Sequence, residues 1–244
     1  MTDGRILVIT SCTGLKAGDT DPLTADDFAE GVRHVKDRHA TDLRDVVVPA
    51  ESLYRGQHHL RLMRGVQVAR DAGVQVDVRI VSAGYGLVRG DAELAPYECT
   101  FQGMGVGQRR DWARHVDIPA SVKRALAEPY SLALILLGED YLAACQLERA
   151  LVLGGPTLLF CAPSLALSVP AAGNLTIVPL GRREAQRFSC GLVSLKGEVG
   201  ARVLAQVGVG VRPEARADAR ELLTWLDGIE PSATHGTDTD LALF

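Results

Sequence analysis

The sequence lacks the features that mark several classes of protein. Its five cysteines are scattered, with no CxxC pair and no Cys/His spacing, which argues against a disulfide framework and a zinc site. No apolar run approaches the roughly 18 residues that a membrane-spanning helix needs. The first residues show no charged segment followed by a long apolar one, as a secretory signal would. We therefore expect a cytoplasmic protein that avoids membranes and needs no metal or other cofactor.

The chain also lacks the positive charge of a dedicated DNA-binding protein. It has 26 Lys and Arg against 30 Asp and Glu, a formal net charge of −4. Any contact with nucleic acid must then use a local basic patch. With 47% hydrophobic residues in a chain of 244, the composition is that of a globular protein with a sizeable core.

Apolar runs of strand length alternate with helical patterns along the chain. We expect strands at residues 6–10, 46–49, 74–81, 132–137, 156–161 and 175–179. We expect helices at residues 25–38, 58–72, 107–116, 120–127, 139–151, 195–207 and 215–226. The alternation predicts a single α/β domain over residues 1–210, with a mostly parallel sheet flanked by helices. A C-terminal helix within 211–229 and a flexible tail at 230–244 would follow, because the tail is rich in Ser, Thr, Asp and Gly.

The most informative segment, residues 81–101, follows an apolar strand and holds three glycines. Glycine allows a positive φ and close approach by another group, and a long loop in a compact domain is often functional. We expect an ordered pocket wall at the carboxyl end of a strand, where open α/β sheets bind ligands. Its candidate ligand-binding residues are Ser82, Gly84, Tyr85, Gly86, Tyr97, Glu98, Thr100 and Phe101. The alternative is a structural loop whose aromatic rings form a small satellite core.

The turn after the first strand, SCTGLK, has groups suited to an anion. Ser11, Cys12 and Lys16 lie where backbone N–H groups and a cation can converge, although the spacing of a P-loop is missing. The alternative is a plain tight turn with a solvated lysine. A further hypothesis is a thiol enzyme, because a cysteine near helix N-termini and a lysine can have a lowered pKa.

Residues 50–65 form the most basic stretch of the chain. Tyr54 and Gly56 precede a predicted helix, whose first turn offers free N–H donors, and Tyr54 could stack on a base. The groups expected to hold backbone phosphates are Arg55, His58, His59 and Arg61. The alternative is a charged, solvated helix face.

Three carboxylates are candidates for catalysis. Asp91 lies in the glycine-rich segment, and Glu139 and Asp140 follow the strand at 132–137 in an LGED turn. A carboxylate can activate water or stabilise a developing cation. Alternatively, Glu139 and Asp140 only favour the first turn of the following helix. Ser164 follows the strand at 156–161 in a similar polar turn and is a candidate ligand-binding residue.

The motifs SCTGLK, LYRG, SAGYGLV and PYECTF resemble those of an uncharacterised bacterial and phage domain family. Its members show S/G-C-x-x-K, L-Y-x-G, S-A-x-x-G-L and P-Y-[DE]-x-T, and the match covers about the first 140 residues. The matching residues are Ser11, Cys12, Lys16, Leu53, Tyr54, Gly56, Ser82, Ala83, Gly86, Leu87, Asp91, Pro96, Tyr97, Glu98 and Thr100. Members often carry several lysines after the cysteine, where this chain has Thr13-Gly14-Leu15-Lys16. The family is distantly similar to the YaaA-like peroxide-stress proteins, so the resemblance implies DNA binding.

A second likeness concerns residues 134–168. A strand ending in LLG and a later one ending in APSL look like the last two core strands of uracil-DNA-glycosylase-type proteins. In those enzymes a His-Pro-Ser turn inserts beside the flipped nucleotide, whereas Ala162 stands in the place of that histidine here. No Gly-Gln-Asp-Pro motif follows the first strand. The resemblance implies a DNA-glycosylase-like fold whose chemistry uses other residues.

These observations predict a nucleobase-directed enzyme on nucleic acid, DNA rather than RNA, or on a nucleotide. The expected activity is that of an N-glycosidase that excises a modified base, in phage defence or in DNA modification or repair. Extruding a base requires an enclosed pocket to receive it. The ring of Tyr85, Tyr97 or Phe101 would stack on the base in that pocket. Ser82, Asp91 and Glu98 would read the base edge. The alternative is a non-catalytic DNA- or nucleotide-binding protein of stress response or defence.

Overall fold

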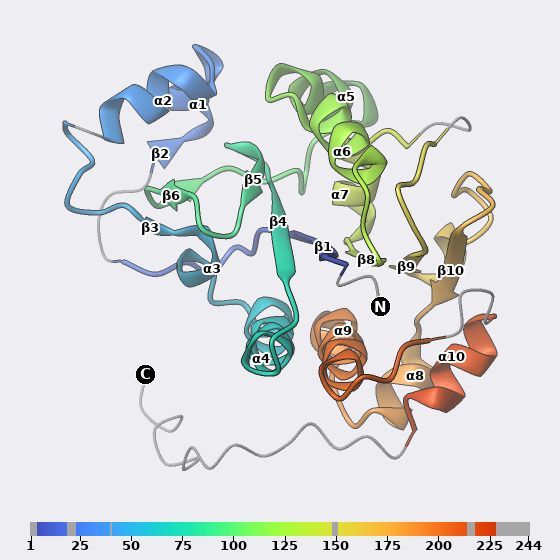
Figure 1. Ribbon diagram of the computed structural model, residues 1–244. Helices are drawn as coiled ribbons and strands as arrows, with labels where there is room; N and C mark the ends of the chain where they lie inside the picture. The colour runs from blue at the N-terminus through green and yellow to red at the C-terminus, as the bar shows by residue number, and fades with distance from the viewer. Residues whose placement is uncertain (1–3, 19–22, 40, 148–150, 214–217, 228–244) are drawn as a thin grey trace.

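A six-stranded, mostly parallel β-sheet forms the centre of the structure (Figure 1). The computed structural model describes residues 4–18, 23–39, 41–147, 151–213 and 218–227. In spatial order the strands are β10 (Leu175–Pro179), β9 (Thr157–Cys161), β8 (Leu132–Leu136), β1 (Ile6–Ser11), β4 (Val76–Ser82) and β5 (Gly86–Arg89). The first five are mutually parallel, and β5 pairs antiparallel with β4 at the edge. The predicted fold class is therefore confirmed.

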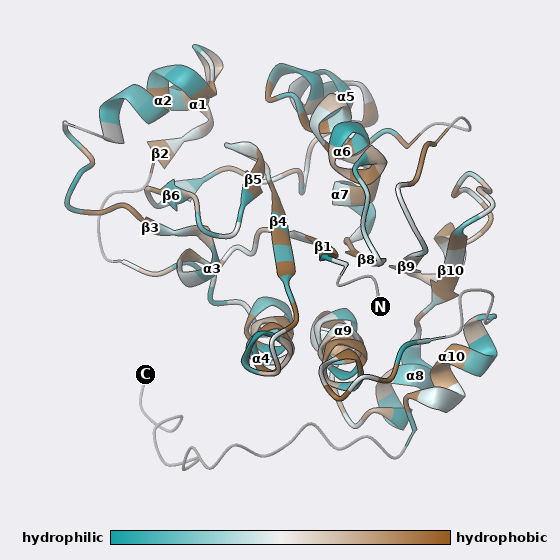
Figure 2. Cartoon of the chain, viewed as in Figure 1, coloured by the Kyte–Doolittle hydropathy of each residue, from teal (hydrophilic) through white to brown (hydrophobic). Residues whose placement is uncertain are grey.

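Continuous apolar sequence places the strands in the middle of the core. Every residue of β8 (LALIL) and of β9 (TLLFC) is buried, as expected for parallel strands that are covered on both faces. Figure 2 shows apolar residues on the helix α9 (Leu192–Gly208), which packs against β8. Burial of apolar side chains from both faces therefore holds the sheet between two layers of helices.

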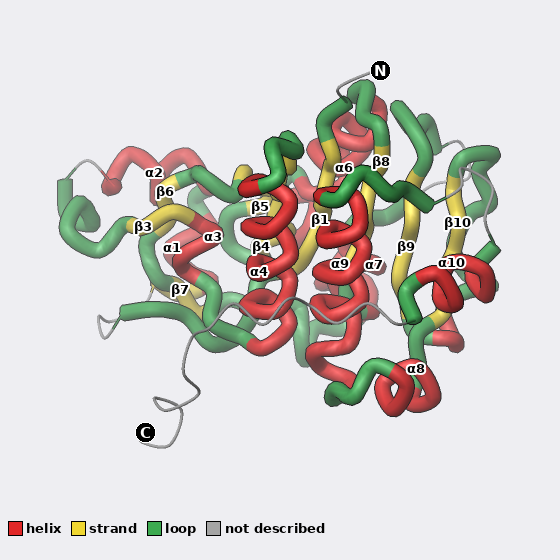
Figure 3. Tube along the Cα trace, turned by 60° about the horizontal axis from the view of Figure 1, so that its bottom comes forward, coloured by secondary structure: helices red, strands yellow, loops and turns green. Residues whose placement is uncertain are grey.

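The two helical layers differ in how closely they are packed. On one face α4 (Gln57–Asp71) and α9 lie side by side in front of the strands (Figure 3). A Cβ at Gly65 of α4 would lie 2.3 Å from Ala201 Cα of α9, so this crossing requires glycine. The other face carries α5 (Val106–His115), α6 (Ile118–Ala127) and α7 (Glu139–Ala144). At the β10 edge lie the 3₁₀ turn η1 (Pro163–Leu165), α8 (Arg182–Arg187) and α10 (Ala219–Trp225).

A lobe built from two distant segments lies beside the β5 edge (Figure 1). Its helices are α1 (Ala25–Ala29), α2 (Val32–His39) and α3 (Ala50–Leu53). Its small strands pair β2 (Leu23–Thr24) with β7 (Tyr97–Glu98), and β3 (Val48–Pro49) with β6 (Glu93–Leu94). The lobe thus joins the segment after β1 to the glycine-rich segment after β4.

The structure corrects three of the expected elements. The helix expected at 25–38 is two helices, because Gly31 has a φ of +105° that ends α1. The helix expected at 139–151 ends at Ala144, and Gln146 has a φ of +47°. The glycine-rich segment is not an irregular loop but a tight hairpin, β4–β5, followed by β6 and β7. The tail expected at 230–244 lies outside the described residues.

The C-terminal helix belongs to the main core. Leu222, Leu223 and Leu226 are buried, and α10 packs against β10. Within the described ranges, no helix combines the length and apolarity needed to cross a bilayer.

Candidate functional site

The strand order creates one place where the chain turns in opposite directions. If the parallel strands β1, β4, β8, β9 and β10 are numbered 1 to 5 along the chain, their order across the sheet is 2-1-3-4-5. The first and third of them, β1 and β8, are therefore neighbours. From β1 the chain leads to β4 on one side, and from β8 it leads to β9 on the other. Open α/β sheets bind ligands outside the carboxyl ends of the strands at such a switch point. The turns after β1 and β8 are therefore the first place to look for a site.

The turns after β1 and β8 are in direct contact. The sulfur of Cys12 lies 2.9 Å from the hydroxyl of Tyr141 in α7. Cys12 is 6% exposed, and the Tyr141 ring packs edge-on against Phe101. Burial and the neighbouring Cys12 raise the pKa of Tyr141, so its phenol keeps its proton. The sequence placed Cys12 at a strand end correctly but gave no indication of this partner.

Buried hydroxyl groups continue from this contact under the glycine-rich hairpin. Ser82 Oγ donates to Tyr97 Oη at 2.7 Å, and the hydroxyls of Tyr97 and Tyr54 lie 2.9 Å apart. The backbone N–H of Tyr85 donates to Ser82 Oγ at 2.9 Å. Burial raises the pKa of Tyr54 and of Tyr97 well above the ordinary value, so both remain neutral. These groups form a closed hydrogen-bonded cluster rather than an acid–base pair.

The aromatic rings of this segment are not available to stack on a base. Tyr54, Tyr97 and Phe101 are fully buried, and Tyr85 is 3% exposed. Tyr85 and Tyr97 pack edge-on against Phe28 with ring centroids 4.8 and 5.8 Å away. These rings are therefore packed inside the protein, as the structural alternative held, but they belong to the main hydrophobic core and not to a separate satellite core. Ser82, fully buried, cannot read a base edge in this conformation.

The glycines of the hairpin serve this packing. Gly86 has a φ of +77°, and a Cβ there would lie 2.2 Å from the carbonyl oxygen of Val116. A Cβ at Gly84 would lie 2.7 Å from the Phe28 ring. The sequence indicated that another group can approach these glycines closely, but it did not indicate whether that group belongs to the protein or to a ligand.

The turn after β1 meets the segment before α4. The N–H of Gly56 donates to Thr13 Oγ1 at 3.1 Å, and Lys16 pairs with Tyr54 in an isolated β-bridge. The Lys16 ammonium, however, lies 4.5 Å above the Tyr97 ring and 3.5 Å from Glu98 Oε1. Lys16 therefore already has an anionic partner, and its side chain is only 8% exposed.

The basic stretch does not form one phosphate-binding face. His58 and His59 are buried, and His58 Nε2 lies 2.9 Å from Thr10 Oγ1. Burial, aided by Lys196 and His59, lowers the pKa of His58 to about 3, while burial also lowers the pKa of His59. The prediction that these histidines hold phosphates is wrong. The sequence signal for the burial of His58 was its helical spacing to Leu62, Val66 and Ala69, which places all four residues on one helix face.

Other members of the basic stretch face outward. Arg55 is exposed, and Arg61 Nη1 donates to Glu198 Oε2 of α9 at 2.8 Å. Of the predicted phosphate-binding groups, only the arginines therefore remain accessible.

Two predicted ligand-binding residues outside this stretch, Thr100 and Ser164, are also exposed.

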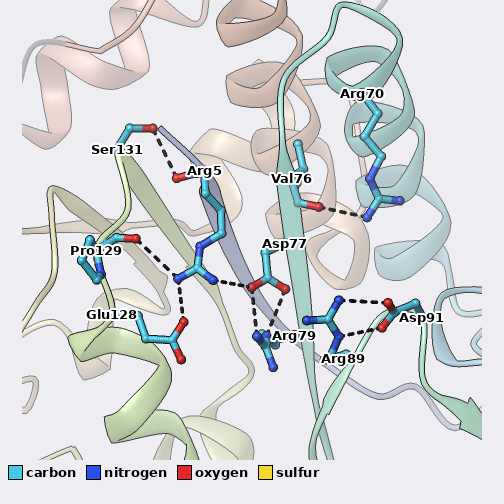
Figure 4. A network of polar contacts seen from close by, with 10 residues as sticks. All are labelled: Arg5, Arg70, Val76, Asp77, Arg79, Arg89, Asp91, Glu128, Pro129 and Ser131. Atoms are coloured by element: carbon cyan, nitrogen blue, oxygen red, sulfur yellow. Dashed lines mark hydrogen bonds and ion pairs between the residues drawn. The ribbon is translucent and has the colours of Figure 1, made fainter. Parts of the chain in front are cut away.

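Asp91 lies at the opposite end of the sheet from the switch point. Because β5 runs antiparallel to β4, the chain returns to the amino edge, where Gly90 N–H donates to the Val78 carbonyl. There Asp91 accepts two hydrogen bonds from Arg89, at 2.9 Å each (Figure 4). These bonds lower the pKa of Asp91, which is 69% exposed. The expectation that Asp91 shares a pocket wall with the carboxyl-edge residues is therefore wrong.

The network around Asp91 is balanced in charge. Arg5 pairs with Asp77 and Glu128, and Arg79 also pairs with Asp77. The pairs Arg5–Asp77, Arg89–Asp91 and Arg70–Glu51 line an open hollow of about 620 Å³. Since each carboxylate here already faces a guanidinium, this hollow is best explained as structural.

Glu139 and Asp140 differ sharply in environment. Asp140 Oδ1 lies 2.7 Å from Arg109 Nη2 of α5, whereas Glu139 has no hydrogen bond or ion pair within the described part of the chain. Glu139 is exposed and lines a hollow of about 250 Å³ together with Arg109. The other walls are Leu142, Ala143, Gln146, Leu147, Leu165, Ser168, Val169 and Pro170. Sequence reasoning missed Arg109, since nothing in a helical arginine points to a pocket.

Comparison with known proteins identifies a domain without an assigned activity. Residues 40–152, just under half of the chain, match the model of a family of unknown function (DUF6884). No curated protein matches the chain. The matched region includes the tyrosine cluster, Arg109 and Glu139. Among the described residues, no group of three or more His, Cys, Asp and Glu is placed to hold a metal ion.

Proposed function

We propose that the protein is a nucleobase-directed N-glycosidase in which Glu139 is the catalytic carboxylate. The observation that carries the proposal is a carboxylate without a partner among the described residues, in a hollow at the start of α7, next to the switch point. Asp91 and Asp140 are each bound by an arginine, so Glu139 is the candidate left free to act on a ligand.

The lining of the hollow suits one base and its sugar. Leu142, Leu147, Leu165 and Val169 offer an apolar wall, and Ser168 and Gln146 offer polar groups at its rim. Its volume of about 250 Å³ is close to the lower end of the range of small-molecule pockets. A single nucleobase-bearing unit, rather than a stretch of duplex, would therefore enter it, as base extrusion allows.

Glu139 would act on the sugar side of the bond. Cleavage of the C1′–N bond builds positive charge on the sugar, which a nearby carboxylate stabilises electrostatically. The same carboxylate can take a proton from the water whose oxygen bonds to C1′, while the base leaves with the bonding electron pair and takes a proton from solvent water. Asp140 is bound by Arg109, so Asp140 would position rather than react.

The test is an assay for released base. The protein is incubated with unmodified and hypermodified phage DNA, single- and double-stranded, and with free nucleotides, and mass spectrometry then detects the base. Strand breaks after alkali report abasic sites. We expect Glu139→Gln to lower the rate by about 10²–10⁴-fold. Asp91→Asn is the matched control and should release base at the wild-type rate, because Asp91 lies at the other end of the sheet.

Two results would contradict the proposal. Equal rates for wild type and Glu139→Gln would show that Glu139 is not catalytic. Release of no base from any of these substrates would favour the alternative, a DNA- or nucleotide-binding protein without N-glycosidase activity.

A further inference from the structure

A third hollow, of about 600 Å³, lies on the other side of the sheet from Glu139. It opens between α4, α8 and the start of α9, beyond the carboxyl end of β10. Its lining residues are Arg61, Arg182, Ala185, Gln186, Ser189, Cys190, Gly191 and Leu192. Two of these are arginines and none is acidic, in contrast to the balanced hollow at the amino edge.

Both arginines have guanidinium N–H donors that no described residue accepts. Arg61 donates to the buried Glu198 through Nη1 alone, and its side chain remains 33% exposed. Arg182 is exposed and has no ion pair or hydrogen bond from its side chain to any described residue. Three nearby carboxylates already have partners: Glu198 binds Arg61 and Arg202, Glu184 accepts from Gly181 N–H, and Asp227 binds Arg187. The hollow therefore presents the Arg182 guanidinium, which no described carboxylate binds, and the donors of Arg61 that Glu198 does not take up.

The backbone adds to the same polarity. The helix α9 is 17 residues long and begins after Gly191 in the lining, a glycine that has no side chain to cap the first turn. The amino end of such a helix carries partial positive charge and unsatisfied N–H groups. Guanidinium forks and helix N-termini both match the oxygens of a phosphate.

We propose that this hollow is a binding site for a phosphate group, held between Arg61 and Arg182 over the start of α9. The phosphate can belong to a nucleic-acid backbone or to a small phosphorylated molecule. The site does not depend on the chemistry of Glu139, since it lies on the opposite face of the sheet.

Cys190 provides a direct readout of occupancy. It lines the hollow and is partly exposed, whereas Cys12, Cys99, Cys145 and Cys161 are buried. Maleimide labelling of the folded protein should therefore modify Cys190 first. Two probes are titrated, inorganic pyrophosphate and a mixed-sequence single-stranded oligonucleotide, and the labelling rate of Cys190 is followed by peptide mass spectrometry. All measurements use the full chain carrying Glu139→Gln, so that no probe is consumed.

We expect the probe to protect Cys190, and Arg182→Gln to raise the concentration needed by about ten-fold, as the loss of one charge-assisted contact implies. Arg183→Gln is the matched control, because Arg183 is exposed on the same helix but outside the lining. Protection by both probes indicates a general phosphate site, and protection by the oligonucleotide alone indicates a backbone site. Failure of both probes to protect Cys190, or equal effects of the two substitutions, would overturn the proposal.

Discussion

The hydroxyl of Tyr141 lies 2.9 Å from the sulfur of Cys12, and this contact spans the switch point of the sheet. Cys12 directly follows β1, and Tyr141 stands in the first turn of α7, two residues after Glu139. The contact thus fixes the start of α7 against the sheet. It connects the buried tyrosine cluster to the hollow in which Glu139 is exposed.

Removing the Tyr141 hydroxyl should therefore loosen the first turn of α7. Tyr141→Phe is expected to lower the free energy of unfolding by about 0.5–1.5 kcal/mol, the usual contribution of one hydrogen bond. If α7 positions Glu139, the kcat of base release should fall as well. Tyr130→Phe is the matched control, because the Tyr130 hydroxyl bonds Thr157 Oγ1 at 2.8 Å, at the start of β9, away from the switch point. An equal fall in kcat for both variants would contradict a positioning role.

The Tyr97 ring is expected to act on stability rather than on ligand binding. Tyr97→Ala empties a fully buried site and should lower the free energy of unfolding by about 3–5 kcal/mol, as truncation of a buried aromatic ring does. Tyr97→Phe keeps the ring but leaves Ser82 and Tyr54 without a partner, which should cost about 1–3 kcal/mol. Urea unfolding measures both. A Tyr97→Ala protein as stable as wild type would show that the ring is not part of the core.

The buried His58 should make the protein less stable in mild acid. Its pKa is about 3 in the folded protein and 6.5 in the unfolded chain, so the unfolded chain takes up the proton first as the pH falls. Stability is therefore fully present above about pH 6.5 and is lost as the pH falls toward 3, at about 1.4 kcal/mol per pH unit. Urea midpoints between pH 7 and pH 4.5 measure the loss.

Two measurements separate this effect from general acid sensitivity. His58→Gln should show a shallower pH dependence than wild type, whereas Leu62→Ala, destabilised by packing on the same helix face, should keep the wild-type slope. In the folded wild-type protein, the ring resonances of His58 should not titrate above about pH 5. A His58 titration near pH 6.5 would contradict its burial as a neutral ring.

The close crossing of α4 and α9 should tolerate no side chain at Gly65. A Cβ there would lie 2.3 Å from Ala201 Cα, so Gly65→Ala must push the helices apart and should cost about 1–3 kcal/mol or more. Gly107→Ala in α5 is the control, because a Cβ at that position meets nothing within 4 Å. It should be neutral or raise the free energy of unfolding by up to about 1 kcal/mol. Thermal unfolding of the two variants compares them directly.

Much of the architecture could be predicted from local patterns. The fully apolar runs of β8 and β9, and their alternation with helical patterns, indicated a covered parallel sheet. The residues that end β1 and β8 were also recognised as candidates, since carboxyl ends of parallel strands meet at one edge. The errors lay in the glycine-rich segment, where glycines and tyrosines are equally consistent with a ligand pocket and with dense packing.

The sequence by itself determined the class of fold and the edge at which to look for a site, because hydrophobic periodicity is a local property of the chain. The tertiary structure alone decided which carboxylate has no partner among the described residues. Asp91, Glu139 and Asp140 are equivalent in sequence terms, but the return of β5 places Asp91 beside Arg89 at the amino edge, and Arg109 of α5 binds Asp140. Pairing between charges far apart along the chain depends on how the elements pack, which no local pattern encodes. Among the described residues, this pairing leaves Glu139 as the unpaired carboxylate in the hollow.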